Sequence, residues 1–154
     1  MRKFEIVRDD CIQYNQSANT IKMPVRATKH SVCYDFYSPI NYTLSPNETK
    51  LVFTNVKAQF NADEGLILAV TSGMGKRGVI LANGIGIIES DYFSNESNDG
   101  NIGFLLHNIG STPYEIHTGD KIGQGFFFKF LTVDNEEEIT TTRTCGFGST
   151  DKKS

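Results

Sequence analysis

The sequence predicts an all-β protein, and three observations support this prediction. Short segments in which apolar and polar residues alternate recur along the chain, as they do in strands with one buried face. Clusters of glycine, proline and asparagine separate these segments at short intervals. No stretch has the apolar spacing of a convincing amphipathic helix. Together these features indicate an all-β sandwich or barrel.

The expected strands follow one another from the N-terminus. The segments with the clearest strand pattern are 3–7, 49–60, 65–70, 79–81, 101–108 and 121–130. In the last of them, period-two alternation places Ile122, Gln124 and Phe126 on one face. The continuous apolar run over 65–70 is typical of a buried strand.

Length and composition favour one domain. A chain of 154 residues can enclose one core, and eleven Phe and six Tyr supply bulk where Trp is absent. The segment after about residue 138 is rich in Thr, Gly and Lys and has little to bury. We therefore expect a β-body over residues 1–138 and a flexible C-terminal arm over residues 139–154.

Charge and cysteine content argue against several classes of protein. The net charge of −3 argues against a broad nucleic-acid-binding surface, which is usually strongly basic. Three widely spaced cysteines without a CxxC pair argue against a disulfide framework and a structural zinc site. No run approaches the ~18 apolar residues that a membrane span needs. We expect a cytoplasmic protein that binds neither nucleic acid nor membrane.

The stretch from Asn83 to Tyr92 combines a glycine turn, an apolar strand, two carboxylates and a ring. Asn83 to Gly86 is expected to form a tight hairpin turn. Alternation then places Glu89 and Asp91 on one face and Tyr92 on the other. Such a turn can hold a flat polar ring beside a carboxylate that activates water. Taken alone, the stretch fits an ordinary hairpin with a solvated acidic edge better.

Three further segments carry candidate binding groups. The glycine-rich stretch 72–78 can cradle an anion with backbone N–H groups and the Ser72 hydroxyl, although it lacks Walker A spacing. Gln124 is a polar side chain that needs a partner if buried. The stretch 143–150 combines a guanidinium, an aromatic ring between glycines and two hydroxyls. Each has a plain alternative: a surface loop, a glutamine that caps a strand end, and a flexible linker.

In order along the chain, these pieces resemble the trimeric dUTPases (deoxyuridine triphosphate nucleotidohydrolases), especially those of Gram-positive bacteria and their phages. The resemblance runs from about Arg26 to Thr150 and touches all five family motifs. The matching segments are 31–36, 70–75, 83–92, 119–124 and 143–150. Each match is weak alone, but five in the right order are specific.

The resemblance implies a distorted jelly-roll β-barrel that assembles as a homotrimer, with each active site drawn from three subunits. It implies hydrolysis of dUTP to dUMP and diphosphate with Mg²⁺. By motif matching, Glu89 takes the place of the water-activating aspartate, and Asp35 holds a water on the metal. The residues implied to bind substrate are Ser72, Gly73 and Gln124 at the phosphates, Asn83, Gly86 and Ile88 at uracil, Tyr92 under the deoxyribose, and Arg143, Phe147, Gly148, Ser149 and Thr150 from the arm.

The sequence departs from the family pattern at several of these positions. Glu89 is one methylene longer than the usual aspartate, and Thr71 stands where an arginine is usual, so that Lys76 or Arg77 would have to supply the missing charge. Cys33 and Cys145 stand where glycines are usual. These departures leave an alternative open: a weakened dUTPase-like protein that binds deoxyuridine nucleotide and acts as a regulatory or protein-binding module.

Overall fold

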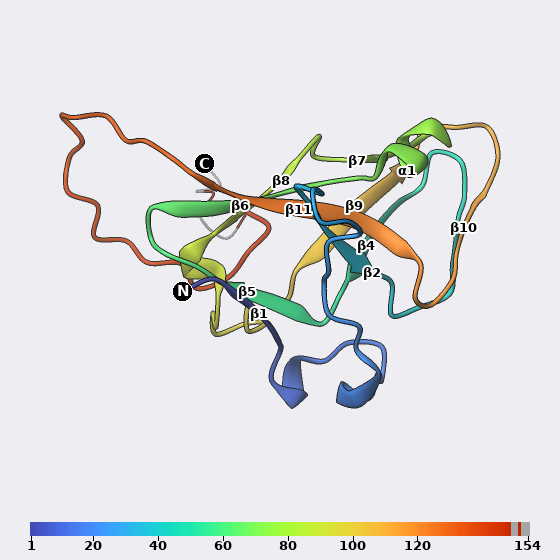
Figure 1. Cartoon of the computed structure of the whole chain (residues 1–154), viewed down its shortest axis with the longest axis horizontal. Coiled ribbons are helices and arrows are strands. Elements are labelled where there is room, and N and C mark those ends of the chain that lie inside the picture. The colour runs from blue at the N-terminus through green and yellow to red at the C-terminus, as the bar shows by residue number, and fades with distance from the viewer. Residues whose placement is uncertain (149–150, 152–154) are drawn as a thin grey trace.

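The computed structural model describes residues 1–148 and 151, and antiparallel strands are its main regular structure (Figure 1). The strands are β1 Lys3–Ile6, β2 Tyr34–Tyr37, β3 Tyr42–Leu44, β4 Thr49–Phe53, β5 Val56–Gln59, β6 Glu64–Ala69, β7 Val79–Leu81, β8 Gly86–Glu89, β9 Gly103–Asn108, β10 Tyr114–Ile116 and β11 Lys121–Lys129. The helical pieces are η1 Asp9–Cys11, η2 Ala18–Thr20, α1 Ser72–Lys76 and η3 Ser90–Tyr92.

The described strands form four antiparallel sheets. The two larger sheets have the orders β2-β11-β6-β8 and β4-β9-β7, and the pairs β1-β5 and β10-β3 complete the body. This arrangement confirms the predicted all-β, jelly-roll-like fold. Over the described residues, the sheets do not close into one continuous barrel.

The core lies between the two larger sheets. Fully buried side chains from both meet there, and the rings of Phe36 on β2 and Phe104 on β9 approach to 5.3 Å between centroids. Burial of these apolar surfaces is the main stabilising contribution to such a sandwich. The core cluster also includes Leu44, Val52, Leu66, Leu68, Val79, Leu81, Ile102, Leu106, Ile116 and Ile122.

A β-bulge near the start of β11 changes which residues face the core. The register with β2 shifts between Lys121 and Gly123, so Ile122 and Gly123 both turn inward. A Cβ at Gly123 would lie 2.0 Å from the ring of Phe104, so only glycine fits. Alternation then resumes out of phase, and Phe127 packs against the core. The prediction that Gln124 shares a face with Ile122 is therefore wrong.

The predicted hairpin at residues 83–86 is also wrong. β7 pairs with β9, whereas β8 pairs with β6, so the turn carries the chain from one sheet to the other. The turn itself forms as expected, with Gly84 at φ +78° and its N–H donating to the Leu81 carbonyl. Whether β7 and β8 pair with each other or with other strands depends on contacts with distant parts of the chain. The residues of the turn alone do not determine those contacts.

The segment 130–148, which includes the start of the C-terminal arm, leaves the body after β11 and returns to it near β8. Figure 1 shows the segment after β11 running outward and folding back, without a strand or helix in the described residues up to 148. Several of its apolar side chains are exposed, most of all Leu131 at 97%. In the part of the chain that the structure describes, no helix is long and apolar enough to cross a bilayer.

Candidate active site

A first pocket, here called the Ser72 pocket, gathers residues from three of the five family segments. It lies where β2, β11 and the start of α1 meet. Its lining is Ala27, Ser31, Val32, Cys33, Asp35, Thr71, Ser72, Gly73, Lys121 and Gln124. The structure therefore brings together the predicted residues Asp35, Ser72, Gly73 and Gln124.

An ion pair crosses the Ser72 pocket. The Lys121 ammonium lies 2.9 Å from the carboxylate of Asp35, which is buried, and this hydrogen bond raises the pKa of Lys121. Asp35 and Gln124 are direct partners across β2 and β11, so their side chains point to the same side. The Gln124 amide donates to the Val70 carbonyl at 3.2 Å. Sequence reasoning missed Lys121, although it lies inside the matching segment 119–124.

The stretch predicted as a glycine-rich loop begins with a short helix instead. Thr71 is the N-cap of α1, and its side chain accepts a hydrogen bond from the Met74 N–H at 3.3 Å. This bond satisfies one of the donors that a helix start leaves unpaired. Ser72 and Gly73 then lie exposed in the first turn of α1. The residue that replaces the family arginine therefore shapes the backbone beside the pocket.

Cys33 also lines the Ser72 pocket. Burial and the nearby Asp35 carboxylate both raise the pKa of its thiol. The thiol is therefore neutral at physiological pH and contributes no charge of its own to the pocket.

A second pocket, here called the Glu89 pocket, gathers the other two family segments. Its lining is Leu68, Asn83, Gly86, Ile87, Ile88, Glu89, Tyr92, Gly103, Arg143, Gly146, Phe147 and Gly148. The strand β8 supplies one wall, and the returning arm supplies another. A Cβ at Gly86 would lie 2.9 Å from the Leu68 side chain, so glycine is required for the close approach of β8 to β6. Leu68 and Gly103 were not among the predicted residues.

Arg143 of the arm bridges two carboxylates, that of Glu89 at the end of β8 and that of Asp91 just after it. Its guanidinium donates to Glu89 Oε2 and to Asp91 Oδ1, both at 3.1 Å. The arginine side chain is only 17% exposed, whereas Glu89 remains 53% exposed. Glu89 therefore keeps access to the pocket while the arm neutralises its charge.

Tyr92 is buried, although its neighbours in the chain, Asp91 and Phe93, are more accessible. Its strand ends at Glu89, and Ser90–Tyr92 forms a 3-10 turn that drives the ring into the body. The phenol donates to the Asn101 carbonyl at 2.7 Å and accepts from the Asn98 amide at 2.8 Å. Burial raises the pKa of the Tyr92 phenol to about 12, so the hydroxyl stays protonated.

The arm closes over Tyr92 through glycine and aromatic residues. A Cβ at Gly146 would lie 2.6 Å from the Tyr92 ring, which makes glycine necessary at this contact. Phe147 takes a positive φ of 50° and packs edge-on against Phe53 of β4 with 6.1 Å between ring centroids. Phe147 remains more than half exposed. The predicted site residues Ser149 and Thr150 lie outside the described residues.

The two pockets are separated along one sheet. Gln124 pairs with Ala69 on β6, and Glu89 pairs with Gly65 on the same strand. These β6 positions are about 13 Å apart along the strand, and β11 and β8 flank β6 with roughly 10 Å between them. The backbones of Gln124 and Glu89 are therefore roughly 16 Å apart. In one chain, the structure does not gather all the predicted groups around one point.

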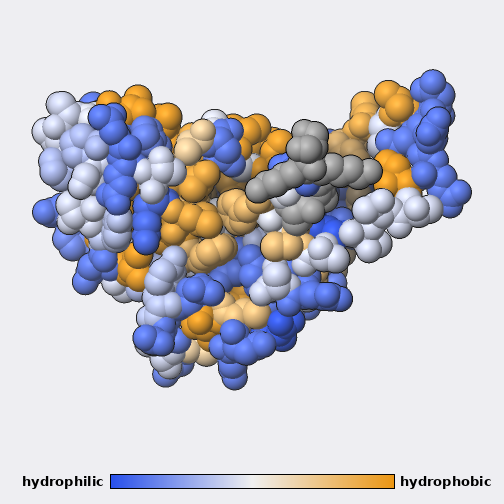
Figure 2. All heavy atoms as spheres, turned by 180° about the vertical axis from the view of Figure 1, so that it is seen from behind, coloured by the Kyte–Doolittle hydropathy of each residue, from blue (hydrophilic) through white to orange (hydrophobic). Residues whose placement is uncertain are grey.

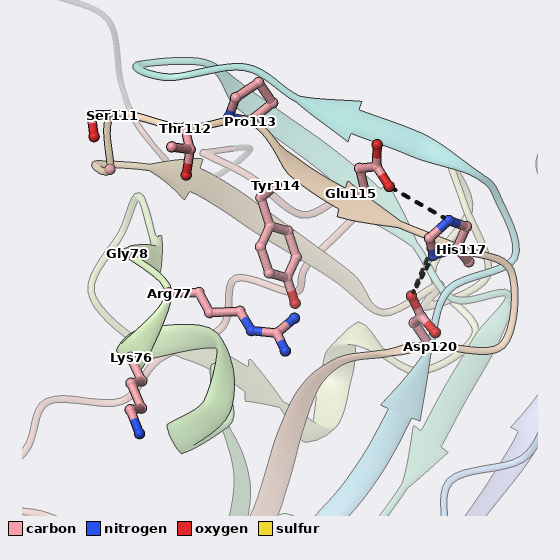
Figure 3. A pocket seen from close by; sticks show the side chains of 11 residues that line it. Lys76, Arg77, Gly78, Ser111, Thr112, Pro113, Tyr114, Glu115, His117 and Asp120 are labelled. Atoms are coloured by element: carbon pink, nitrogen blue, oxygen red, sulfur yellow. Dashed lines mark hydrogen bonds and ion pairs between the residues drawn. The ribbon is translucent and has the colours of Figure 1, made fainter.

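A third pocket lies outside both of these, between α1 and β10. Figure 3 shows the Arg77 guanidinium pointing toward the Tyr114 hydroxyl, while Glu115 and Asp120 flank His117. Lys76 and Arg77 line this third pocket and are absent from the described lining of the Ser72 pocket. Within one chain, the cation that lines the Ser72 pocket is therefore Lys121, and the expectation that Lys76 or Arg77 supplies the missing charge stays a prediction.

The side chains of the Ser72 pocket fit a magnesium ion that takes most of its ligands from phosphate oxygens and water, and few from the protein. Over residues 1–148 and 151, no group of three or more His, Cys, Asp or Glu side chains is arranged to hold a metal. Asp35 offers one carboxylate beside the Ser72 hydroxyl. Mg²⁺ in nucleotide sites keeps several waters and is held by one or two carboxylates together with phosphate oxygens.

Comparison with known proteins gives one consistent result. The dUTPase family model matches residues 19–151. The chain is 34% identical over 152 residues to the deoxyuridine 5′-triphosphate nucleotidohydrolase of Lactococcus lactis, with 97% of each chain covered. It is 36% identical over 140 residues to the fowlpox virus protein of the same name, covering 86% of this chain and 91% of the viral one.

Solved structures agree with the sequence comparison. The dUTPase of Streptococcus mutans is similar with a TM-score of 0.73 and 30% identity, over 86% of this chain and 98% of that one. The dUTPase of Staphylococcus aureus phage phi11 has a TM-score of 0.70 at 17% identity, over 94% and 99%, and shares the fold. From the family model, the sequence identities and the fold, we conclude that this chain belongs to the dUTPase family.

Proposed function

We propose that the protein hydrolyses dUTP to dUMP and diphosphate, with Glu89 as the general base. The observation that carries this proposal is the exposed Glu89 carboxylate, fixed at the end of β8 in a pocket that also contains Tyr92 and Arg143 of the arm. A carboxylate is ionised at neutral pH and can accept a proton from a water molecule. Membership of the dUTPase family supplies the substrate class.

In the proposed reaction, Glu89 accepts a proton from water while the water oxygen bonds to the α-phosphorus. The bond from that phosphorus to its bridging oxygen breaks, and diphosphate leaves with the electron pair. Glutamate is one methylene longer than aspartate, but Glu89 lies at an exposed strand end, so its carboxylate has room to reach the position that a base needs. In the free protein the hydrogen bond from Arg143 holds this carboxylate in one place.

The Ser72 pocket is proposed to bind the triphosphate. The Ser72 hydroxyl, the Gly73 N–H, the Gln124 amide and the Lys121 ammonium are donors there, and such donors stabilise negative charge on phosphate oxygens. Asp35 is proposed to hold a water of the nucleotide's Mg²⁺ ion. When bound, Mg²⁺ neutralises charge on phosphate oxygens.

The Glu89 pocket is proposed to bind the nucleoside. Asn83 and backbone groups of Gly86 and Ile88 lie at its lining and offer donors and acceptors to the uracil edge. Tyr92 is proposed to pack under the deoxyribose and to leave no space for a 2′-hydroxyl. Phe147, in the left-handed region between two glycines, is proposed to cover the base, with Gly148 allowing the sharp turn that follows.

The arm is proposed to exchange partners when substrate binds. In the free protein Arg143 neutralises Glu89 and Asp91, and a triphosphate carries more negative charge than these two carboxylates. We propose that Arg143 moves to the phosphates together with Ser149 and Thr150, which frees Glu89 to accept a proton. Closure of the arm over the nucleotide excludes bulk water.

The active assembly is proposed to be a homotrimer. The Ser72 pocket and the Glu89 pocket hold different parts of the proposed site and are far apart within one chain. Figure 2 shows apolar residues along the arm where it projects from the body, and Phe130, Leu131, Val133 and Ile139 are exposed. Burial of these side chains against a second copy would be favourable. A second copy would also bring the two kinds of pocket together.

We propose that the chain divides into a β-body over residues 1–138 and a C-terminal arm over residues 139–154. In the structure β11 ends at Lys129, so the final described segment, which has no strand, begins nine residues before the proposed arm. A nucleotide substrate is consistent with action in the cytoplasm. The binding-only regulatory alternative gains no specific observation from the described residues, because Glu89, Tyr92 and Arg143 meet in one pocket.

The substitution Glu89→Gln tests the proposed function. It keeps the size of the side chain and removes the base, so kcat for dUTP should fall about 100-fold or more. Diphosphate release in the presence of Mg²⁺ measures kcat, and the affinity for dUMP shows whether the nucleotide pocket is intact. Glu115→Gln, at an exposed position on β10, is the matched control and should keep wild-type kcat. An unchanged kcat in Glu89→Gln would exclude Glu89 as the base.

A further inference from the structure

The loop 93–100, which joins η3 to β9, holds Tyr92 from two sides. The Asn98 amide donates to the Tyr92 hydroxyl at 2.8 Å, and the Asn95 amide donates to the Tyr92 carbonyl at 2.8 Å. No other described side chain donates to that hydroxyl. The loop therefore contacts both the backbone and the ring end of the residue that we place under the sugar.

The two asparagines are themselves fixed within the loop. Asn98 Oδ1 accepts from Asn95 Nδ2 at 2.8 Å and from the Gly100 N–H at 3.1 Å. Asn95 Oδ1 accepts from the N–H groups of Ser97 and Asn98. Because each amide is oriented by its neighbours, the donor that Asn98 presents to Tyr92 has one direction.

A buried ion pair anchors the loop to the body. The Asp99 carboxylate is almost fully buried and accepts from Lys57 Nζ at 2.7 Å and from the Arg8 N–H at 2.8 Å. Burial opposes ionisation of Asp99, but these hydrogen bonds outweigh it and lower the pKa of the carboxyl. Gly100 follows at φ +86°, where a Cβ would lie 2.8 Å from the Tyr92 carbonyl oxygen. The loop is thus a rigid support for Tyr92.

The same loop receives the arm. The Ser97 hydroxyl donates to the Cys145 sulfur at 3.1 Å, and Gly146 packs on the Tyr92 ring. The ring therefore lies between the loop and the returning arm, and its position depends on both.

We propose that Asn98 is a specificity-determining residue that positions Tyr92 against the sugar, so that a 2′-hydroxyl cannot be accommodated. This inference rests on the proposed role of Tyr92 in the dUTPase reaction. A ring can exclude one small hydroxyl only if it cannot move aside, and the Asn98 amide and the Asn101 carbonyl together fix the hydroxyl end of the ring. Asn98 itself acts through Tyr92 and does not touch substrate.

The substitution Asn98→Asp removes the donor to the Tyr92 hydroxyl. Aspartate keeps the Oδ1 acceptor that Asn95 and Gly100 use, but it adds a negative charge beside the phenol oxygen, and the Tyr92 O–H can donate to this carboxylate only by giving up the Asn101 carbonyl. The ratio of kcat/KM for dUTP over UTP should fall about tenfold, mainly through a lower KM for UTP, while kcat for dUTP changes less than about twofold. Glu96→Gln, at an exposed position in the same loop, is the control and should keep the wild-type ratio.

Two further measurements keep the proposal testable if activity is low or the variant is unstable. Binding of dUMP and UMP by calorimetry gives the same discrimination without turnover. In a Tyr92→Phe background, Asn98→Asp should change discrimination little, because the hydroxyl that it acts on is gone. Thermal unfolding of each variant shows whether the loop survives.

The outcomes separate this inference from the proposed function. A wild-type protein that hydrolyses dUTP in preference to UTP, with an Asn98→Asp variant that discriminates equally well, would overturn the inference and leave the function intact. A protein that prefers dUMP to UMP in an Asn98-dependent way but releases no diphosphate would support the inference and overturn the function. Equal binding of dUMP and UMP by the wild type would overturn the inference, because there would be no discrimination for Asn98 to support.

Discussion

The Ser72 pocket and the Glu89 pocket border the same four-stranded sheet but are completed in different ways. The Ser72 pocket is formed by paired strands, a capped helix and the Asp35–Lys121 ion pair, all within the body. The Glu89 pocket needs the arm, which contributes Arg143, Gly146, Phe147 and Gly148. The comparison indicates that the groups proposed to bind phosphate are in place before substrate arrives, whereas the proposed base becomes available only when the arm rearranges.

Removal of residues 143–154 should have the largest effect, because it should lower turnover of dUTP much more than binding of diphosphate. The Glu89 pocket would lose its arginine and its cover, and the loss of a preorganised donor of this kind costs about 10²–10³ in kcat. The Ser72 pocket itself would be untouched, so binding of diphosphate should weaken far less than turnover, by no more than the loss of the arm's own phosphate contacts. Steady-state turnover of dUTP and calorimetry with diphosphate measure the two effects. Loss of the folded body on this truncation would show that the arm is structural instead.

The substitution Lys121→Met alters the other pocket and should have an intermediate effect. It removes the cation that faces Asp35 and the proposed phosphate site, so KM for dUTP should rise about tenfold, as expected for a lost hydrogen bond to a charged group. Lys121→Arg keeps the charge and is the matched control. A rise in KM for both variants alike would mean that packing at this position matters more than charge.

Substitutions at Thr71 should have the smallest effect and show whether the helix cap shapes the Ser72 pocket. Thr71→Val keeps the shape but loses the bond to the Met74 N–H, which should lower the free energy of unfolding by about 1 kcal/mol. Thr71→Ser keeps the cap and should behave like the wild type in chemical denaturation. Thr71→Arg also loses the cap, so an arginine that raises activity would show that the phosphates need charge here more than a capped helix.

The all-β class followed from periodicity and turn residues, and five of the six expected strands formed within two residues of their predicted bounds. The sixth, 49–60, is broken into β4 and β5. The errors share a physical cause. Period-two alternation assumes an unbroken ladder, and the bulge beside Gly123 shifted Gln124 to the outer face. Turn chemistry at Gly84 predicted a turn but could not choose between the partners of β7 and β8.

The candidate site was predictable residue by residue only where a family motif reached. Motif matching predicted Ser72, Gln124 and Glu89 as site residues, and the structure shows which of them line the same pocket. It did not find Lys121 as a partner of Asp35 or Asn98 as a partner of Tyr92, because neither contact follows from spacing along the chain. The two-carboxylate contact of Arg143 joins residues more than 50 positions apart, and it too required the folded chain.

The central claim is that each active site combines the Glu89 pocket of one chain with the Ser72 pocket of another. The most direct test mixes two inactive variants, Glu89→Gln and Ser72→Ala/Gln124→Ala, under conditions in which mass spectrometry shows that subunits exchange. In an equal mixture of closed, symmetric trimers, about a quarter of the shared sites would hold two intact halves, so about a quarter of wild-type turnover should return. Exchanged trimers that recover no activity would contradict the claim, because each chain would then have to complete its site alone.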